Sequence, residues 1–282
     1  MKIDTRFKIL LVSLILIISN LICPLSWAAD SFPKDSNLGV CDNPSNLPAT
    51  REDARQLVSK IRVELESVEE QIRSVPFLEQ VESGKASLEQ IAAVAAEQYS
   101  IILSDWGSFA QLTARFNDIP SRQFFSGIAS GESIALQELI DFAESVGLDE
   151  GNLRNYEPRP KAQTYPSRVA WMAANADRAM VGASLLANFS VFGENMERLR
   201  DALVKVYGFS LEEGTFFSLF AELPPKFEEN AIEVIAAGLI RGACPKEAQT
   251  SARILQAYEL EFWEAVGEPL DSSLPVVRSV SR

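Results

Sequence analysis

Histidine is absent from the 282 residues of this chain. This absence excludes metal sites built on histidine, a haem held by a proximal histidine, and nucleophiles activated by a histidine base. Segments with the alternating pattern of β-strands are also missing, as is any internal repeat of the length typical of solenoids. Strand ladders and repeat arrays are therefore excluded as well.

Basic residues are too few to balance the acidic ones, and the net charge is −13. Hydrophobic residues make up 47% of the chain and charged residues 23%, which is typical of a globular protein with a substantial core. A chain this long and this acidic forms one large or two small domains and is repelled by nucleic acids and anionic lipid surfaces. Nucleic acid is therefore excluded as a partner.

The first 28 residues have the pattern of a secretory signal peptide. Three basic residues precede an apolar run from Ile9 to Ile22, and Ser26 and Ala28 are small residues at the positions before a cleavage site. Cleavage before Ala29 would remove three positive charges and one negative charge, changing the net charge to −15. We therefore expect a periplasmic or extracellular protein without membrane contact after cleavage; an uncleaved anchor is the alternative.

Cys41 and Cys244 are the cysteines left after cleavage. In an oxidising compartment they are expected to form one disulfide, which would close a loop of about 200 residues and stabilise the fold by roughly 5 kcal/mol. Two separate thiols are the alternative.

Apolar periodicity, helix caps and proline or glycine breaks divide the rest of the chain into helices. The predicted helices cover 50–75, 87–117, 121–146, 166–192, 194–206, a segment from 210 to the Pro224-Pro225 break, a segment from 225, and 245–266. Gly127 and Gly131 indicate a kink or a close helix contact, and Gly193 is expected to separate two helices. The prediction is an all-α, single helical bundle of seven to eight helices over 50–267, between an extended lead-in at 29–49 and a flexible tail at 268–282.

Residues 76–116 carry the most informative pattern in the sequence. A capping box at Ser87 and Gln90 opens a long helix with one apolar stripe, formed by Leu88, Ile91, Ala95, Ile102, Trp106, Phe109, Thr113 and Phe116. Gln98 and Asp105 lie at the edge of that stripe. Because polar groups on an apolar face need partners, this pair indicates either a buried network or the wall of a pocket.

Several short motifs, in a shared order over residues 52–266, resemble the haem-oxygenase-fold superfamily, in particular its thiaminase II (TenA) and pyrroloquinoline-quinone-synthase-like branch. The matching blocks are Pro76-Phe77-Leu78 with Glu97-Gln98-Tyr99, Phe125-Ser126-Gly127-Ile128 with Glu132, Lys161 to Tyr165, Leu185 to Phe189, and Phe216-Phe217 with Phe227. The resemblance implies a haem-oxygenase-like bundle with its site among the central helices.

The departures from the family pattern concern its chemistry. Asn188 stands where thiaminase II enzymes have a nucleophilic cysteine, and Gln98 stands where they have an aspartate. Phe220, Pro224 and Phe227 replace the histidines and aspartate of the related di-iron oxidases. Neither family mechanism is therefore expected intact.

Inward polar residues supply the candidate binding site. They are Gln98, Tyr99, Asp105, Tyr165, Asn188 and Glu222, of which Asp105 and Glu222 are the catalytic candidates. Asp105 could instead form an ion pair with an inward arginine, Arg168 or Arg178. The amides could bind a heterocycle or join two helices, and the tyrosines could serve packing alone.

The leading hypothesis is an exported, non-catalytic module that binds a flat small molecule or another protein, with no cofactor and no metal. The first alternative is a thiaminase II-like C–N hydrolase acting on aminopyrimidine or thiamine-related compounds. The second is a metal oxidase whose ligands are all carboxylates: Glu97, Asp105, Glu222 and Glu228. The sequence leaves the ligand and the oligomeric state open, a homo-oligomer included.

Overall fold

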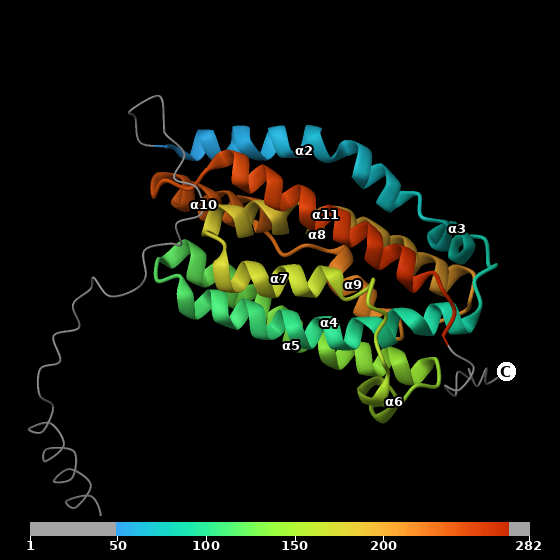
Figure 1. Cartoon of the computed structure of the whole chain (residues 1–282). Helices are drawn as coiled ribbons and strands as arrows, with labels where there is room; N and C mark the ends of the chain where they lie inside the picture. The colour runs from blue at the N-terminus through green and yellow to red at the C-terminus, as the bar shows by residue number, and fades with distance from the viewer. Residues whose placement is uncertain (1–48, 271–282) are drawn as a thin grey trace, which may run out of the picture. The chain divides into compact units, whose positions relative to one another are not determined.

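The computed structural model describes residues 49–270, which fold into ten α-helices without a β-strand in that range (Figure 1). In chain order the helices are α2 (Arg51–Arg73), α3 (Pro76–Glu82), α4 (Leu88–Arg115), α5 (Ile119–Ser145), α6 (Glu150–Asn155), α7 (Thr164–Asn175), α8 (Arg178–Lys205), α9 (Thr215–Ala221), α10 (Phe227–Ile240) and α11 (Pro245–Val266). The all-α prediction is confirmed. The count exceeds the predicted seven to eight because α3 and α6 are short helices without enough turns for a periodic signal.

Capping boxes begin two of the long helices. Ser87 accepts from the backbone N–H of Gln90, whose side chain accepts from the N–H of Ser87 at 2.9 Å, at the start of α4. Thr50 and Asp53 form the same reciprocal pair at the start of α2. These local bonds satisfy amides that lack a partner within the helix, which fixes where each helix begins.

The predicted break at Gly193 is wrong, and the chain breaks earlier. α7 ends at Asn175, Ala176 is extended, and Asp177 caps α8 by accepting from the backbone N–H groups of Ala179 and Met180. α8 then runs unbroken through Gly193. The glycine is needed for close packing instead, because a Cβ there would lie 2.7 Å from the carbonyl oxygen of Phe220.

The predictions around α5 and α9 also need correction. Gly127 and Gly131 make no close helix contact, because a Cβ at either glycine would meet nothing within 4 Å, and they do not interrupt α5. Ser210 and Glu213 bond reciprocally in a turn, and the helix predicted from residue 210 begins only at Thr215. The break at Pro224-Pro225 is confirmed, but α10 begins at Phe227, because Lys226 adopts a left-handed conformation with φ of 66°.

The helices pack in two sets that share a core. α4 packs against α5 and α7, whereas α8 packs against α9, α10 and α11, and α2 lies along α10 and α11 (Figure 1). Because α5 and α7 cover different sides of α4, its buried surface is wider than one stripe: Ala92 to Tyr99 are all buried. Trp106, predicted to face the core, is 40% exposed.

Several predictions lie outside the described residues. The signal peptide at 1–28, most of the lead-in at 29–49, Cys41 and residues 271–282 of the tail all belong to this group. Cys244 is buried directly before α11, and its disulfide to Cys41 stays a prediction. Within residues 49–270, no helix is long and apolar enough to cross a membrane.

Candidate functional site

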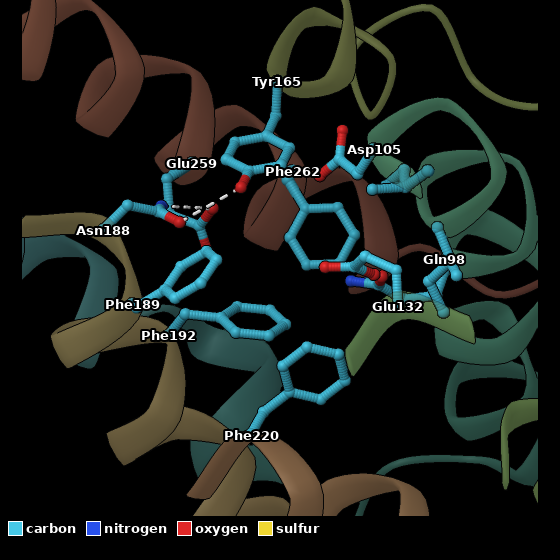
Figure 2. Close-up of a pocket in the computed structure, with 12 residues that line it drawn as sticks. Gln98, Asp105, Glu132, Tyr165, Asn188, Phe189, Phe192, Phe220, Glu259 and Phe262 are labelled. Carbon is cyan, nitrogen blue, oxygen red and sulfur yellow. Dashed lines mark hydrogen bonds between the residues drawn. The ribbon is translucent and has the colours of Figure 1, made fainter. Parts of the chain in front are cut away.

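Four of the six predicted site residues line one small cavity between the central helices. Gln98 and Asp105 reach it from α4, Tyr165 from α7 and Asn188 from α8 (Figure 2). The cavity has a volume of about 30 Å³ and is also lined by Glu132 of α5 and Glu259 of α11. Residues far apart in the sequence thus meet in one place.

The other two predicted residues lie elsewhere. Tyr99 follows Gln98 in α4 and so points to a different side of the helix, where its hydroxyl donates to Glu150 at 3.2 Å. Glu222 is exposed at the end of α9 and lines a larger pocket on the outside of the bundle. Neither residue lines the small cavity.

Asn188 joins three helices. Tyr165 donates from its hydroxyl to Asn188 Oδ1 at 3.2 Å, and Asn188 Nδ2 donates to Glu259 Oε2 at 2.9 Å (Figure 2). The second oxygen of Glu259 accepts from the indole nitrogen of Trp263 at 2.6 Å. The amide therefore has the helix-joining role that the sequence left open, and it holds the Glu259 carboxyl at the cavity wall.

Sequence reasoning missed Glu132 and Glu259 as site residues. Each is a buried carboxyl residue on an apolar stripe, with Leu255 and Phe262 beside Glu259 and Ala135 and Leu139 beside Glu132. This is the same signal that singled out Asp105 on α4. It could have been recognised in α5 and α11 as well.

Asp105 is only 4% exposed, and its Oδ1 atom has no hydrogen-bond partner. The expected ion pair with an arginine is wrong: Arg168 lies over the ring of Trp171, and Arg178 pairs with Asp118. Burial is the main cause that raises the pKa of Asp105 well above its usual range, followed by the negative charges of Glu132 and Glu259. A buried carboxyl oxygen without a partner is costly, so it marks a place where a ligand could donate.

The two added glutamates also hold protons more tightly than usual. Burial raises the pKa of Glu132 to about 8 and that of Glu259 to about 7, although the hydrogen bonds from Asn188 and Trp263 oppose the shift at Glu259. Burial and the three neighbouring carboxylates also raise the pKa of Tyr165. The cavity therefore contains carboxyl groups that can gain or lose a proton near neutral pH.

Aromatic rings line much of the rest of the cavity. Phe189, Phe192, Phe220 and Phe262 line it, and Phe192 and Phe220 meet edge to face with their centroids 5.2 Å apart (Figure 2). The site therefore combines acidic groups with flat apolar walls, which suits a flat molecule carrying hydrogen-bond donors.

The hypothetical metal site made only of carboxylates is wrong. Glu97 accepts from the hydroxyl of Tyr156 at 2.5 Å, away from the cavity, and Glu228 pairs with Arg62 at 3.0 Å. Glu222 is exposed on another element. Across residues 49–270, no three or more His, Cys, Asp or Glu side chains are placed to hold a metal ion together.

Comparison of the sequence with protein-family models finds one matching family. The sequence model of the TENA/THI-4/PQQC family matches residues 63–268. No curated protein matches this chain at a significant level.

Solved structures with the same fold are distant in sequence. A TenA homologue from Pseudomonas syringae pv. tomato matches with a TM-score of 0.66 and 11% identity, over 78% of this chain and 98% of that one. A TenA homologue from P. horikoshii has a TM-score of 0.61 and 16% identity, over 75% and 99%. A domain with a haem oxygenase-like fold from Shewanella denitrificans has a TM-score of 0.57 and 18% identity, over 76% and 89%. These likenesses confirm the predicted haem-oxygenase-like fold.

Proposed function

Because the chain belongs to the TENA/THI-4/PQQC family, we propose that it uses the acidic cavity to bind a small, flat nitrogen base, such as an aminopyrimidine. The observation that carries this proposal is the buried Asp105 carboxyl, whose Oδ1 atom lacks a partner inside the protein. An aminopyrimidine presents a ring nitrogen beside an amino group. Such an edge can pair with a carboxyl group through two hydrogen bonds. The amino group donates to one oxygen, and either a protonated carboxyl donates to the ring nitrogen or a protonated ring nitrogen donates to the carboxylate.

The residues around Asp105 support the same ligand class. Glu132 and Glu259 add two carboxyl groups and no cation lines the cavity, so an anionic ligand would be repelled. The rings of Phe192 and Phe262 can cover the faces of a flat heterocycle. The lining residues include no serine, cysteine or lysine, which favours binding over covalent catalysis.

A matched pair of probes tests this proposal. Calorimetric titration at pH 7 should show that 4-aminopyrimidine binds at least tenfold more tightly than pyrimidine, which lacks the amino group. Asp105→Asn should reduce the affinity for 4-aminopyrimidine at least tenfold. Asp141→Asn, at an exposed carboxylate on α5 bonded to Gln137, is the control and should leave it unchanged. Equal affinity for the two probes, or an unchanged affinity in Asp105→Asn, would contradict the proposal.

A second candidate function is C–N hydrolysis of the thiaminase II type, and the pKa of Glu259 near 7 favours it. A group with such a pKa can exchange protons at neutral pH. Glu259 would act as the base and take a proton from water, whose oxygen bonds to the methylene carbon of thiamine while Asp105 holds the aminopyrimidine edge. The electron pair of the breaking C–N bond goes to the thiazolium nitrogen, which leaves as a neutral thiazole and needs no proton. Chromatography of thiamine incubated with the protein distinguishes the two functions: fragments that disappear with Glu259→Gln support hydrolysis, and intact thiamine supports binding alone.

We also propose that the protein acts outside the cytoplasm, on the pattern of residues 1–28. N-terminal sequencing of the protein from its native cells should begin at Ala29. A mature chain that begins at Met1 would contradict cleavage.

A further inference from the structure

A second, larger pocket lies against the acidic cavity. This outer pocket has a volume of about 590 Å³ and lies between α5, α8, α9, the loop after α9, and α10. Its lining is mainly apolar, with Phe124, Ile128, Ile134, Leu219, Leu223 and Phe227 among its residues. Gly127 and Gly131 lie one helical turn apart on the same side of α5, and the absence of side chains at both leaves space.

The two spaces share one wall. Glu132, Phe189, Phe192 and Phe220 line both the acidic cavity and the outer pocket. The separation between them is therefore made of side chains and not of a helix. Phe189 and Phe220 are only partly buried, so this wall also borders solvent.

Volume decides how a ligand can use the site. A cavity of about 30 Å³ has room for one or two water molecules, whereas small-molecule sites span roughly 300–1,000 Å³. An aromatic ring cannot fit in the acidic cavity unless the phenylalanine wall moves. Movement of that wall joins the cavity to the outer pocket, whose volume lies within the usual range.

We propose that the acidic cavity and the outer pocket form one bipartite site, and that its ligand is a nitrogen base carrying an uncharged, apolar substituent. This inference rests on the proposed function for the base and adds the substituent. The base pairs with Asp105 at the inner end, and the substituent lies along α5 over Gly127 and Gly131. No arginine or lysine lines the outer pocket, and Glu132 and Glu222 are both at its wall, so a phosphorylated substituent is disfavoured.

Affinity should rise with the apolar length of the ligand. Each CH₂ group buried from water contributes about fourfold in affinity. 4-Aminopyrimidine with an n-butyl group on carbon 5 should therefore bind at least thirtyfold more tightly than 4-aminopyrimidine itself. The same chain ended by a carboxylate should lose most of that gain.

A glycine pair supplies the matched variants. Gly131→Leu fills the outer pocket from an exposed helical position where a Cβ meets nothing within 4 Å. This variant should abolish the increase in affinity that the butyl group gives (the butyl gain) and leave the affinity for 4-aminopyrimidine unchanged. Gly107→Leu, at an equally open and exposed position on α4 away from both spaces, should change neither affinity. A butyl gain below threefold, or a gain that survives Gly131→Leu, would overturn the bipartite site.

Failure of the base to bind is a separate outcome, and it would overturn the proposed function. In that case the neutral fluorophore N-phenyl-1-naphthylamine tests the outer pocket directly. Enhanced fluorescence that is lost in Gly131→Leu and retained in Gly107→Leu would support an apolar binding pocket there. No enhancement with the unaltered protein would overturn the outer pocket as a binding site.

Discussion

The carboxyl groups of Asp105 on α4 and Glu259 on α11 line the same cavity, and the charge on Glu259 helps raise the pKa of Asp105. Two buried carboxyl groups without a cation between them oppose each other's ionisation. The native state therefore retains protons that the unfolded chain would release. This relationship makes both stability and ligand binding depend on pH near neutrality.

The free energy of unfolding should fall as pH rises from 5.5 to 8.5. The folded pKa values of Glu259 (about 7) and Glu132 (about 8) lie above those of an unfolded glutamate, so their contribution is complete only at low pH and is lost as pH rises through them. Glu259 alone should account for about 2 kcal/mol over this window. Urea unfolding at several pH values measures the decline.

Glu259→Gln isolates that contribution, because an amide does not titrate. The decline between pH 5.5 and 8.5 should become smaller by about 2 kcal/mol in this variant. Glu261→Gln on the same helix, outside the cavity lining, is the control and should keep the full decline. An unchanged decline in Glu259→Gln would show that Glu259 ionises at its ordinary pKa.

Asp105→Asn should stabilise the protein at pH 8 while it weakens ligand binding. The substitution replaces a buried carboxyl group, whose ionisation burial opposes and whose Oδ1 atom has no partner, by an amide that does not titrate; this should raise the free energy of unfolding by about 1–2 kcal/mol. At pH 5 the gain should shrink, because the raised pKa of Asp105 makes the unaltered protein more stable at low pH than at high pH. Equal effects at both pH values would argue that folding does not raise the pKa of Asp105.

Gly193→Ala should destabilise the protein by about 1–3 kcal/mol, because the new Cβ would lie 2.7 Å from the backbone oxygen of Phe220. Gly127→Ala is the matched helical control. With nothing within 4 Å of its Cβ, it should stabilise the protein by about 0.5–1 kcal/mol through helix propensity. Thermal unfolding compares the two variants, and effects of the same sign would contradict the close packing of α8 against α9.

Arg159→Ala should cost about 3–5 kcal/mol. Its guanidinium lies 3.6 Å from the fully buried Glu97 and donates to the carbonyl oxygens of Ala265 and Pro269, both at 2.9 Å. Removing it leaves a buried charge without its cation and releases the end of α11.

Arg154→Ala is the control for that loss. Arg154 and Glu150 form an exposed pair one turn apart in α6, and such pairs contribute at most about 0.5 kcal/mol. Chemical unfolding should separate the two arginine variants by more than 2 kcal/mol. Similar values for both would mean that Tyr156 and the backbone N–H of residue 159 are enough to satisfy Glu97.

The sequence by itself determined most of the helices and one side of the site. Caps and apolar spacing act between residues a few positions apart, so the starts of α2 and α4 and the burial of Gln98 and Asp105 could be predicted from local pattern. The break before Asp177 was missed because the alanine-rich segment around it favours helix. Its signal was the aspartate cap, without the proline or glycine that usually marks a boundary.

Only the tertiary structure decided which polar residues share a cavity. Each helix buries its own stripe, but the sequence does not specify which stripes face one another, because that depends on how side chains from different helices pack. Packing brings Asp105, Glu132 and Glu259 together and directs Tyr99 to another surface. It also leaves the outer pocket beside them, where Gly127 and Gly131 had indicated only a kink or a contact.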